Sequence, residues 1–136
     1  MNKQKVLVFE AYPFFSGSQR ITLNLCRILK EKGFFITLLL VDDRFNNHTT
    51  NFKDFVDEIT FINTNPILLK YGDEESWFSK KTFFKAIFLG LFPFYLLSLK
   101  KILFKKYDFL YCCDPRGAMM MFFGALFFRG KSILHF

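Results

Sequence analysis

The stretch KVLVFEAYPFFSGSQR, residues 5–20, decides the fold of this 136-residue chain. Its apolar run Val6–Phe9 is too short for a helix and rich in β-forming residues, as is typical of a strand buried on both faces of a parallel sheet. Pro13 ends this extended segment, and the small residues 16–18 form a turn. From Gln19 onward the apolar residues follow a helical period. The stretch therefore predicts a strand, a tight turn and the N-terminus of a helix.

A helix N-terminus behind a small-residue turn is a recurring anion site, because free amides and the positive end of the helix dipole face the turn. Gly17 has no Cβ, so a ligand could approach its backbone closely. The turn Ser16, Gly17 and Ser18 is thus a candidate phosphate site. Ser16 and Gln19 also match a capping box, S-x-x-Q, in which both residues serve the helix itself.

The rest of the chain predicts alternating strands and helices. The first helix is expected from about residue 18 to residue 32, with Gly33 as its stop and an apolar face of Ile21, Leu25, Ile28 and Leu29. Further strands are expected at 34–41, 58–63, 108–113 and 132–136, and helical segments at 52–57 and 116–128. A strand–helix–strand unit implies a parallel pair. The expected fold class is α/β, a Rossmann-like three-layer fold with a parallel sheet of about five strands.

The net charge of +7 is concentrated in residues 80–106, which hold seven Lys and no Asp or Glu. A basic segment with apolar residues favours an anionic membrane surface or an acidic partner. Nucleic acid is not expected, because no recognition motif accompanies these lysines. The uncharged part, residues 86–99, contains Pro93 and is shorter than the roughly 20 residues of a membrane span. A kinked crossover helix, an interfacial helix and a transmembrane span all stay open.

The three cysteines lack the spacing of a disulfide framework or a metal site. Adjacent Cys112 and Cys113 are expected on opposite faces of one strand, and Cys26 lies in the first helix. We expect free thiols in a reducing cytosol and no metal ion. Residues 1–4 lead directly into the first apolar run, which predicts no signal peptide.

Several motifs follow one another along the chain: Tyr12-Pro13, Ser16-Gly17-Ser18-Gln19-Arg20, Gly33-Phe34-Phe35-Ile36-Thr37-Leu38, Tyr107-Asp108-Phe109-Leu110-Tyr111 and Ile133-Leu134-His135. Each is weak alone, but the ordered set resembles the N-terminal domain of the family 4 glycosyltransferases. These are retaining enzymes of GT-B fold that extend lipopolysaccharide, capsule and glycolipid sugars. The resemblance covers nearly the whole chain. The family's second turn glycine is replaced by Ser16 or Ser18.

The resemblance implies two Rossmann-like domains with the active site between them. Residues 1–136 would form the acceptor-side domain, and the C-terminal domain that holds the nucleotide sugar would be absent. The implied function is transfer of a sugar from a nucleotide sugar to a cell-envelope glycan or lipid-linked acceptor. The chain alone is expected to be inactive, because nothing in it supports the leaving diphosphate. A separate chain with the missing domain would be a partner, and the expected location is the cytoplasmic face of the plasma membrane.

By the same resemblance, the Gly17 turn would contact the donor's phosphates, Gln19 would face the acceptor and His135 would be a catalytic residue that contacts the donor sugar. His135 follows the fifth strand, on the edge where ligands bind in open α/β sheets. A structural role at the strand end is the alternative for this histidine. Asp114 follows the fourth strand and either accepts a sugar hydroxyl or caps the next helix.

Two other functions stay open. One is another Rossmann-type nucleotide-binding module, such as a dinucleotide-dependent oxidoreductase, for which Asp42 and Asp43 end the second strand suitably. The turn SGSQR, however, is not the G-x-G-x-x-G of that class. The other is a non-catalytic, membrane-peripheral binding protein that relies on residues 80–106.

Overall fold

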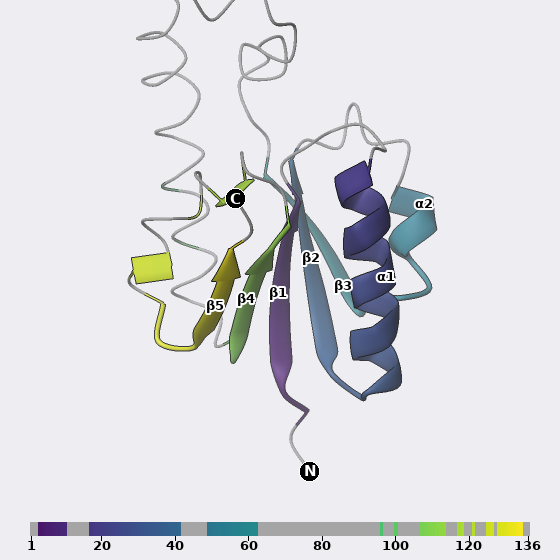
Figure 1. Cartoon of the computed structure of the whole chain (residues 1–136), viewed down its shortest axis with the longest axis horizontal. Coiled ribbons are helices and arrows are strands. Elements are labelled where there is room, and N and C mark those ends of the chain that lie inside the picture. Colours follow the sequence, from purple (N-terminus) through teal and green to yellow (C-terminus); the bar gives the residue numbers. More distant parts are fainter. Residues whose placement is uncertain are drawn as a thin grey trace, which may run out of the picture.

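In the part of the chain that the structure describes, the fold is an α/β arrangement of five strands and the helices α1 and α2 (Figure 1). The structure is a computed structural model, and it describes residues 3–10, 17–41, 49–62, 96, 100, 107–113, 117–118, 121, 125–126 and 128–134. The elements are β1 (Lys5–Glu10), α1 (Gly17–Glu31), β2 (Phe35–Val41), α2 (Thr49–Phe52), β3 (Glu58–Ile62), β4 (Phe109–Cys112) and β5 (Lys131–Leu134). Each strand begins within one residue of the position predicted from the sequence.

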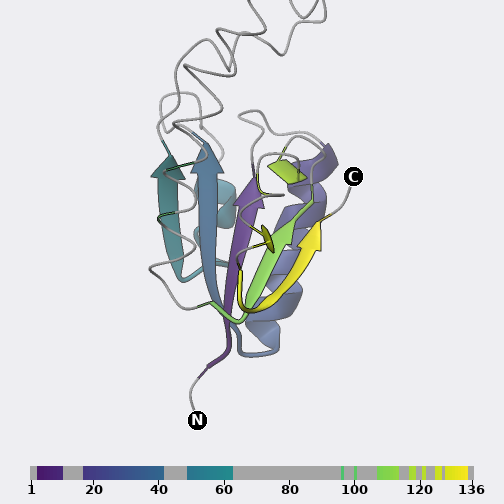
Figure 2. The ribbon, with the colours of Figure 1, turned by 90° about the vertical axis from the view of Figure 1, so that its left-hand side faces the viewer.

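The five strands form one parallel sheet in the order β3-β2-β1-β4-β5. The first strand is therefore the central one: Val6 pairs with Ile36 of β2 on one side and with Phe109 of β4 on the other. Because all neighbours are parallel, all carboxyl ends meet at one edge of the sheet (Figure 2). The predicted Rossmann-like parallel sheet is confirmed.

Successive side chains of a strand point to opposite faces of the sheet, so the buried strands contribute to two apolar layers. On one face, Val8 and Leu38 pack with Cys26 of α1, with Phe52 of α2 and with Val56, which follows α2. On the other, Phe9 and Leu110 pack with Ala118 and Met121, which are helical and lie inside the predicted helix 116–128. The sheet is thus covered on both faces. Cys112 belongs to the second layer and Cys113 to the first, which confirms their predicted opposite orientations.

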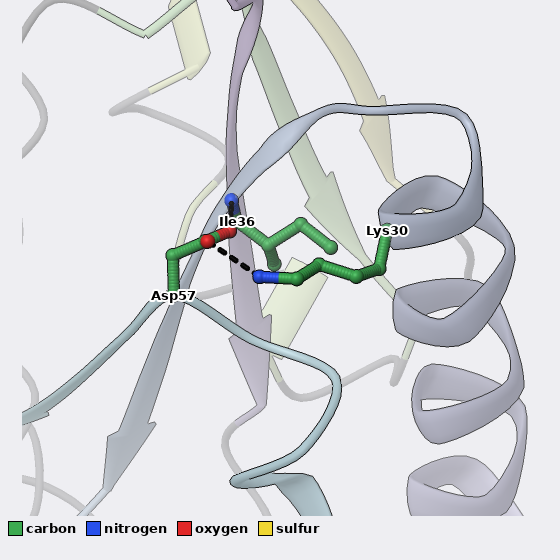
Figure 3. Close-up of polar contacts among 3 residues, drawn as sticks. All are labelled: Lys30, Ile36 and Asp57. Carbon is green, nitrogen blue, oxygen red and sulfur yellow. Dashed lines mark hydrogen bonds and ion pairs between the residues drawn. The ribbon is translucent and has the colours of Figure 1, made fainter.

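Two aspartates make equivalent hydrogen bonds to a neighbouring strand at the amino edge of the sheet. Asp57 directly precedes β3; its Oδ2 accepts the Ile36 amide at 2.9 Å, and its own amide donates to the Ile36 carbonyl at 2.9 Å. Asp108 directly precedes β4 and repeats this exchange with Lys5, at 2.7 and 2.8 Å. Lys30, in the last turn of α1, forms an ion pair with Asp57 (Figure 3). These contacts fix the register of neighbouring strands at the edge opposite the carboxyl ends.

The end of α1 is built as the sequence predicts. Gly33 adopts a φ of 81°, its amide donates to the Lys30 carbonyl at 2.9 Å, and the Phe34 amide donates to the Leu29 carbonyl at 3.1 Å. This pair of bonds is a Schellman motif, for which glycine is suited because it tolerates a positive φ. Gly33 thereby turns the chain directly into β2.

One helix prediction is wrong in part and another is wrong. Of the apolar face predicted for α1, Leu25 and Leu29 pack against the core, but Ile21 and Ile28 are 55% and 47% exposed. The helical turn expected at 52–57 instead lies at Thr49–Phe52. Phe52, the last residue of α2, is buried in the core. The apolar pattern alone suggested that the helical turn begins at this residue.

Most of the basic segment 80–106 lies outside the described residues, so the three interpretations of it stay predictions. Within the residues that are described, no helix has both the length and the apolar character needed to cross a bilayer.

Candidate functional site

The strand order creates a switch point beside the central strand. From β1 the chain moves outward to β2 and β3, and it then crosses to the other side to form β4 and β5. In open α/β sheets, ligands bind in the crevice outside the carboxyl ends of the two strands at which the order reverses. Here those strands are β1, which ends at Glu10, and β4, which ends at Cys112. The candidate site is the carboxyl edge around these two residues.

The most unusual group at this edge is a buried carboxylate. Glu10 is only 1% exposed, and it lies on the same face of β1 as Val6 and Val8, toward α1. Gln19 Nε2 donates to Glu10 Oε1 at 3.2 Å, and Thr22 Oγ1 donates to Glu10 Oε2 at 2.7 Å. A buried carboxylate requires such donors, because its desolvation is otherwise uncompensated. Glu10 therefore joins the carboxyl end of β1 to the first two turns of α1.

This carboxylate explains why α1 is rotated away from its predicted orientation. Its buried residues are Gln19, Thr22 and Cys26, while Ile21 and Ile28 face outward. Full burial of an Ile side chain stabilises a fold by about 1.5–3 kcal/mol. A buried acceptor that loses its donor costs about 1–3 kcal/mol, and more where the acceptor is charged. The helix consequently turns its polar side chains toward Glu10, and Ile21 and Ile28 are left about half-exposed.

Two further titratable groups lie near this carboxylate. Burial, and secondarily the charge of Glu10, raises the pKa of the Cys26 thiol to about 12. Burial also raises the pKa of Tyr111, together with its hydrogen bond to Cys113 and the neighbouring Cys113, Cys112 and Glu10 charges. Both groups hold their protons at neutral pH. Cys26 is therefore not a reactive thiolate, since nucleophilic cysteines have lowered pKa values.

The predicted turn residues that the structure describes lie at this edge. Gly17 is the exposed first residue of α1, and a Cβ at this position would meet no atom of the described residues within 4 Å. Ser18 is half-buried, and its hydroxyl donates to Gln19 Oε1 at 3.2 Å. Gln19 is 3% exposed. The sequence left two roles open for Gln19, contact with the sugar acceptor or capping of the helix. The structure adds a hydrogen bond to Glu10. Acceptor contact by Gln19 stays a prediction.

The other three predicted site residues, Ser16, Asp114 and His135, lie outside the described residues. Their neighbours in the chain are placed. Cys113 follows the carboxyl end of β4, and Leu134 is the carboxyl end of β5. Since β5 is two strands from β1, the two strand ends are roughly 10 Å apart. The positions next to Asp114 and His135 thus belong to the same edge as Gly17, and the contacts of both residues stay predictions.

Sequence reasoning missed Glu10. A glutamate at the end of an apolar strand is usually solvated, so it does not attract notice. The available signal was the pair Gln19 and Thr22, whose spacing of three places both on one helix face. Two polar residues on a face next to buried Cys26 indicate a polar partner beneath the helix.

Among the described residues, no group of three or more His, Cys, Asp or Glu side chains is arranged to hold a metal ion.

No protein-family model matches this sequence, and no curated protein sequence matches it. The fold is similar to that of TcCGT1, a GT-B glycosyltransferase solved in complex with UDP, with a TM-score of 0.57 and 18% identity. The similarity covers 96% of this chain and 28% of the TcCGT1 chain, so the chain spans less than a third of that protein. At this identity the likeness shows the fold alone.

A predicted subunit of a tRNA methyltransferase from Methanocaldococcus jannaschii DSM is also similar, over 96% of this chain and 67% of that chain. Its identity is 12% and its TM-score 0.44, too low to carry an argument about fold or function.

Proposed function

We propose that this chain is the acceptor-side domain of a retaining glycosyltransferase that moves a sugar from a nucleotide sugar to a cell-envelope glycan or lipid-linked acceptor. The observation that carries the proposal is the likeness of 96% of the chain to part of a GT-B glycosyltransferase. The motifs from Tyr12-Pro13 to His135 support the finer assignment to family 4 and to its N-terminal domain. The UDP of TcCGT1 suggests the class of donor.

The carboxyl edge suits the phosphates of such a donor. The first turn of α1 carries the positive end of the helix dipole, which favours an anionic ligand. Among the described residues, no atom lies within 4 Å of a Cβ placed on Gly17, which leaves room for a ligand near this backbone. In the proposal, Ser16, Gly17 and Ser18 face the phosphates, Asp114 accepts a sugar hydroxyl, and His135 contacts the donor sugar.

The complete enzyme requires a second domain. In the GT-B arrangement the other domain holds the nucleotide sugar and stabilises the charge that develops on the leaving diphosphate. We therefore propose that residues 1–136 alone do not transfer sugar and that a donor domain, in the same or another chain, completes the site. In this proposal the reaction uses no metal ion, and residues 80–106 hold the protein at an anionic membrane surface.

The donor contact is tested by titrating UDP into the 136-residue chain and following backbone amide resonances. Changes are expected at Gly17, Ser18 and Cys113, on the carboxyl edge, and not at Lys5 or Asp108, on the amino edge. Unchanged resonances at millimolar UDP, or changes confined to the amino edge, would contradict the proposal. A stronger response to a nicotinamide dinucleotide than to UDP would favour the oxidoreductase alternative.

Two glycine variants sharpen this test. Gly17→Ala adds a methyl group that meets no atom of the described residues within 4 Å, so it should not lower the unfolding temperature and should weaken UDP binding. Gly33→Ala is the matched control: it strains a positive φ, so it should lower the unfolding temperature and leave UDP affinity unchanged. Equal UDP affinity in Gly17→Ala and wild type would remove Gly17 from the proposed contact.

Sugar transfer is tested separately, with nucleotide sugars and a lipid-linked acceptor. The chain alone should show no turnover, and turnover should appear when a GT-B donor domain is supplied. Turnover by the isolated chain would overturn the two-domain requirement.

A further inference from the structure

The carboxylate of Glu10 is held from one side of α1 by two donors. Gln19 reaches one oxygen and Thr22 the other, at 3.2 and 2.7 Å. These two donors are three residues apart, so they share a face of the helix. Two bonds from one face to a single strand end fix both the rotation of α1 and its position along its axis.

This link also joins two elements that follow one another in the chain. Because β1 ends at Glu10 and α1 begins at Gly17, the bond between Glu10 and Gln19 ties the end of the strand to the first turn of the helix. The backbone amides at the start of α1 are therefore set by a contact to the central strand. That contact lies at the switch point, where the proposed donor phosphates would bind.

We propose that Glu10 is a positioning residue: it acts through Gln19 and Thr22 to aim the first-turn amides of α1 at the ligand crevice. This inference rests on the proposed function, because the ligand is taken to be a nucleotide sugar. Glu10 does not itself contact the ligand. Its side chain is 1% exposed, and both of its oxygens accept hydrogen bonds from α1.

The decisive comparison is between Glu10→Ala and Glu10→Gln in the 136-residue chain. The alanine variant removes both acceptors. The glutamine variant keeps the shape, and a flip of the Gln19 amide lets it keep both hydrogen bonds without the charge. The readouts are the amide resonances of Gly17–Gln19, the dissociation constant of UDP and the unfolding temperature.

Glu10→Ala should move the resonances of Gly17–Gln19 and weaken UDP binding by about fivefold to tenfold, the effect of losing one or two orienting hydrogen bonds. Glu10→Gln should restore both toward the wild-type values. Glu58→Ala is the matched control, since Glu58 accepts the Thr37 hydroxyl at 3.1 Å near the amino edge. It should change neither the Gly17–Gln19 resonances nor UDP affinity.

Two results would overturn the inference. One is a Glu10→Ala chain whose Gly17–Gln19 resonances are unchanged. The other is a Glu10→Gln chain with restored resonances but UDP affinity as low as in Glu10→Ala, which would show that the charge acts on the ligand directly. If Glu10→Ala does not fold, Thr22→Val, which removes one of the two donors, is judged in the same way.

The experiments distinguish a failure of the proposed function from a failure of the inference about Glu10. A wild-type chain that does not respond to UDP contradicts the donor contact. The Gly17–Gln19 resonances of the variants still decide whether Glu10 positions α1.

Discussion

Thr22 donates its hydroxyl to Glu10 Oε2 at 2.7 Å, across twelve residues of sequence, and this bond sets which face of α1 meets the sheet. Both side chains are buried. The bond places a hydroxyl where an apolar residue would normally pack. The interface between α1 and the sheet is consequently polar at the carboxyl edge and apolar further along.

Replacement of Thr22 by valine should destabilise the chain. Valine has nearly the same shape but no hydroxyl, so one Glu10 oxygen loses its donor inside the protein. We expect the free energy of unfolding to fall by about 1–3 kcal/mol, as for other buried groups left unsatisfied. Denaturant unfolding measures this. Thr22→Ser keeps the hydroxyl and should cost less; an equal loss in both variants would assign the effect to packing.

Replacement of Ile21 by lysine should have little effect. Ile21 is 55% exposed, and exposed substitutions usually change the free energy of unfolding by about 0.5 kcal/mol or less. Ile36→Ala, in the core beneath α1, should cost about 2–5 kcal/mol and serves as the comparison. Thermal and denaturant unfolding of both variants check this. A large loss in Ile21→Lys would restore the helix orientation that the sequence pattern predicts.

Asp57 should make the chain sensitive to acid. Burial alone would raise the pKa of this carboxyl, but the hydrogen bonds from Lys30 and the Ile36 amide, with the charge of Lys30, lower it below its ordinary value. A lowered folded-state pKa gives stability that is present above the unfolded pKa, about 3.9, and is lost as the pH falls through the folded value. Asp57→Asn should remove this part of the acid transition.

The measurement for Asp57 is the unfolding temperature as a function of pH between neutrality and strong acid. Asp54→Asn, on an exposed neighbour, is the control and should leave the acid profile as in wild type. An Asp57→Asn profile parallel to that of wild type below pH 4 would contradict the assignment.

Gly130 should not tolerate a side chain. A Cβ at this position would collide with the backbone oxygen of Asp108 and with the ring of Phe128. The Asp108 oxygen accepts the Lys131 amide at 3.0 Å, where β5 joins the sheet. Gly130→Ala should therefore cost about 1–3 kcal/mol, in the range of overpacked sites, and loosen β5. Hydrogen exchange of the β5 amides checks this, and protection equal to wild type would contradict it.

The candidate site could be predicted only in part. Gly17 and Ser18 are signalled by a local pattern, small residues between a strand and a helix, and the structure places them at the carboxyl edge. Glu10 gives no local signal, because its partners Gln19 and Thr22 are recognised only when strand and helix meet. The predicted contact of His135 with a donor sugar stays a prediction.

The amino-acid sequence by itself determined the five strands, each to within one residue at its start, and the end of α1. Segments of strand length place β1 to β5, the period of two puts Cys112 and Cys113 on opposite faces, and Gly33 ends α1 because glycine readily accepts the positive φ there. These features depend on near neighbours in the chain, whose spacing the backbone geometry fixes.

Only the tertiary structure decided how α1 sits on the sheet. The apolar pattern predicts one face of Ile21, Leu25, Ile28 and Leu29. Leu25 and Leu29 do pack against the core, but Thr22 is buried on the inner face while Ile21 and Ile28 are exposed. The physical reason is the burial of Glu10 at the end of the central strand. A carboxylate removed from water must find donors, and Gln19 and Thr22 of the helix packed above it supply two of them. That requirement arises only after β1 has been enclosed by its neighbours.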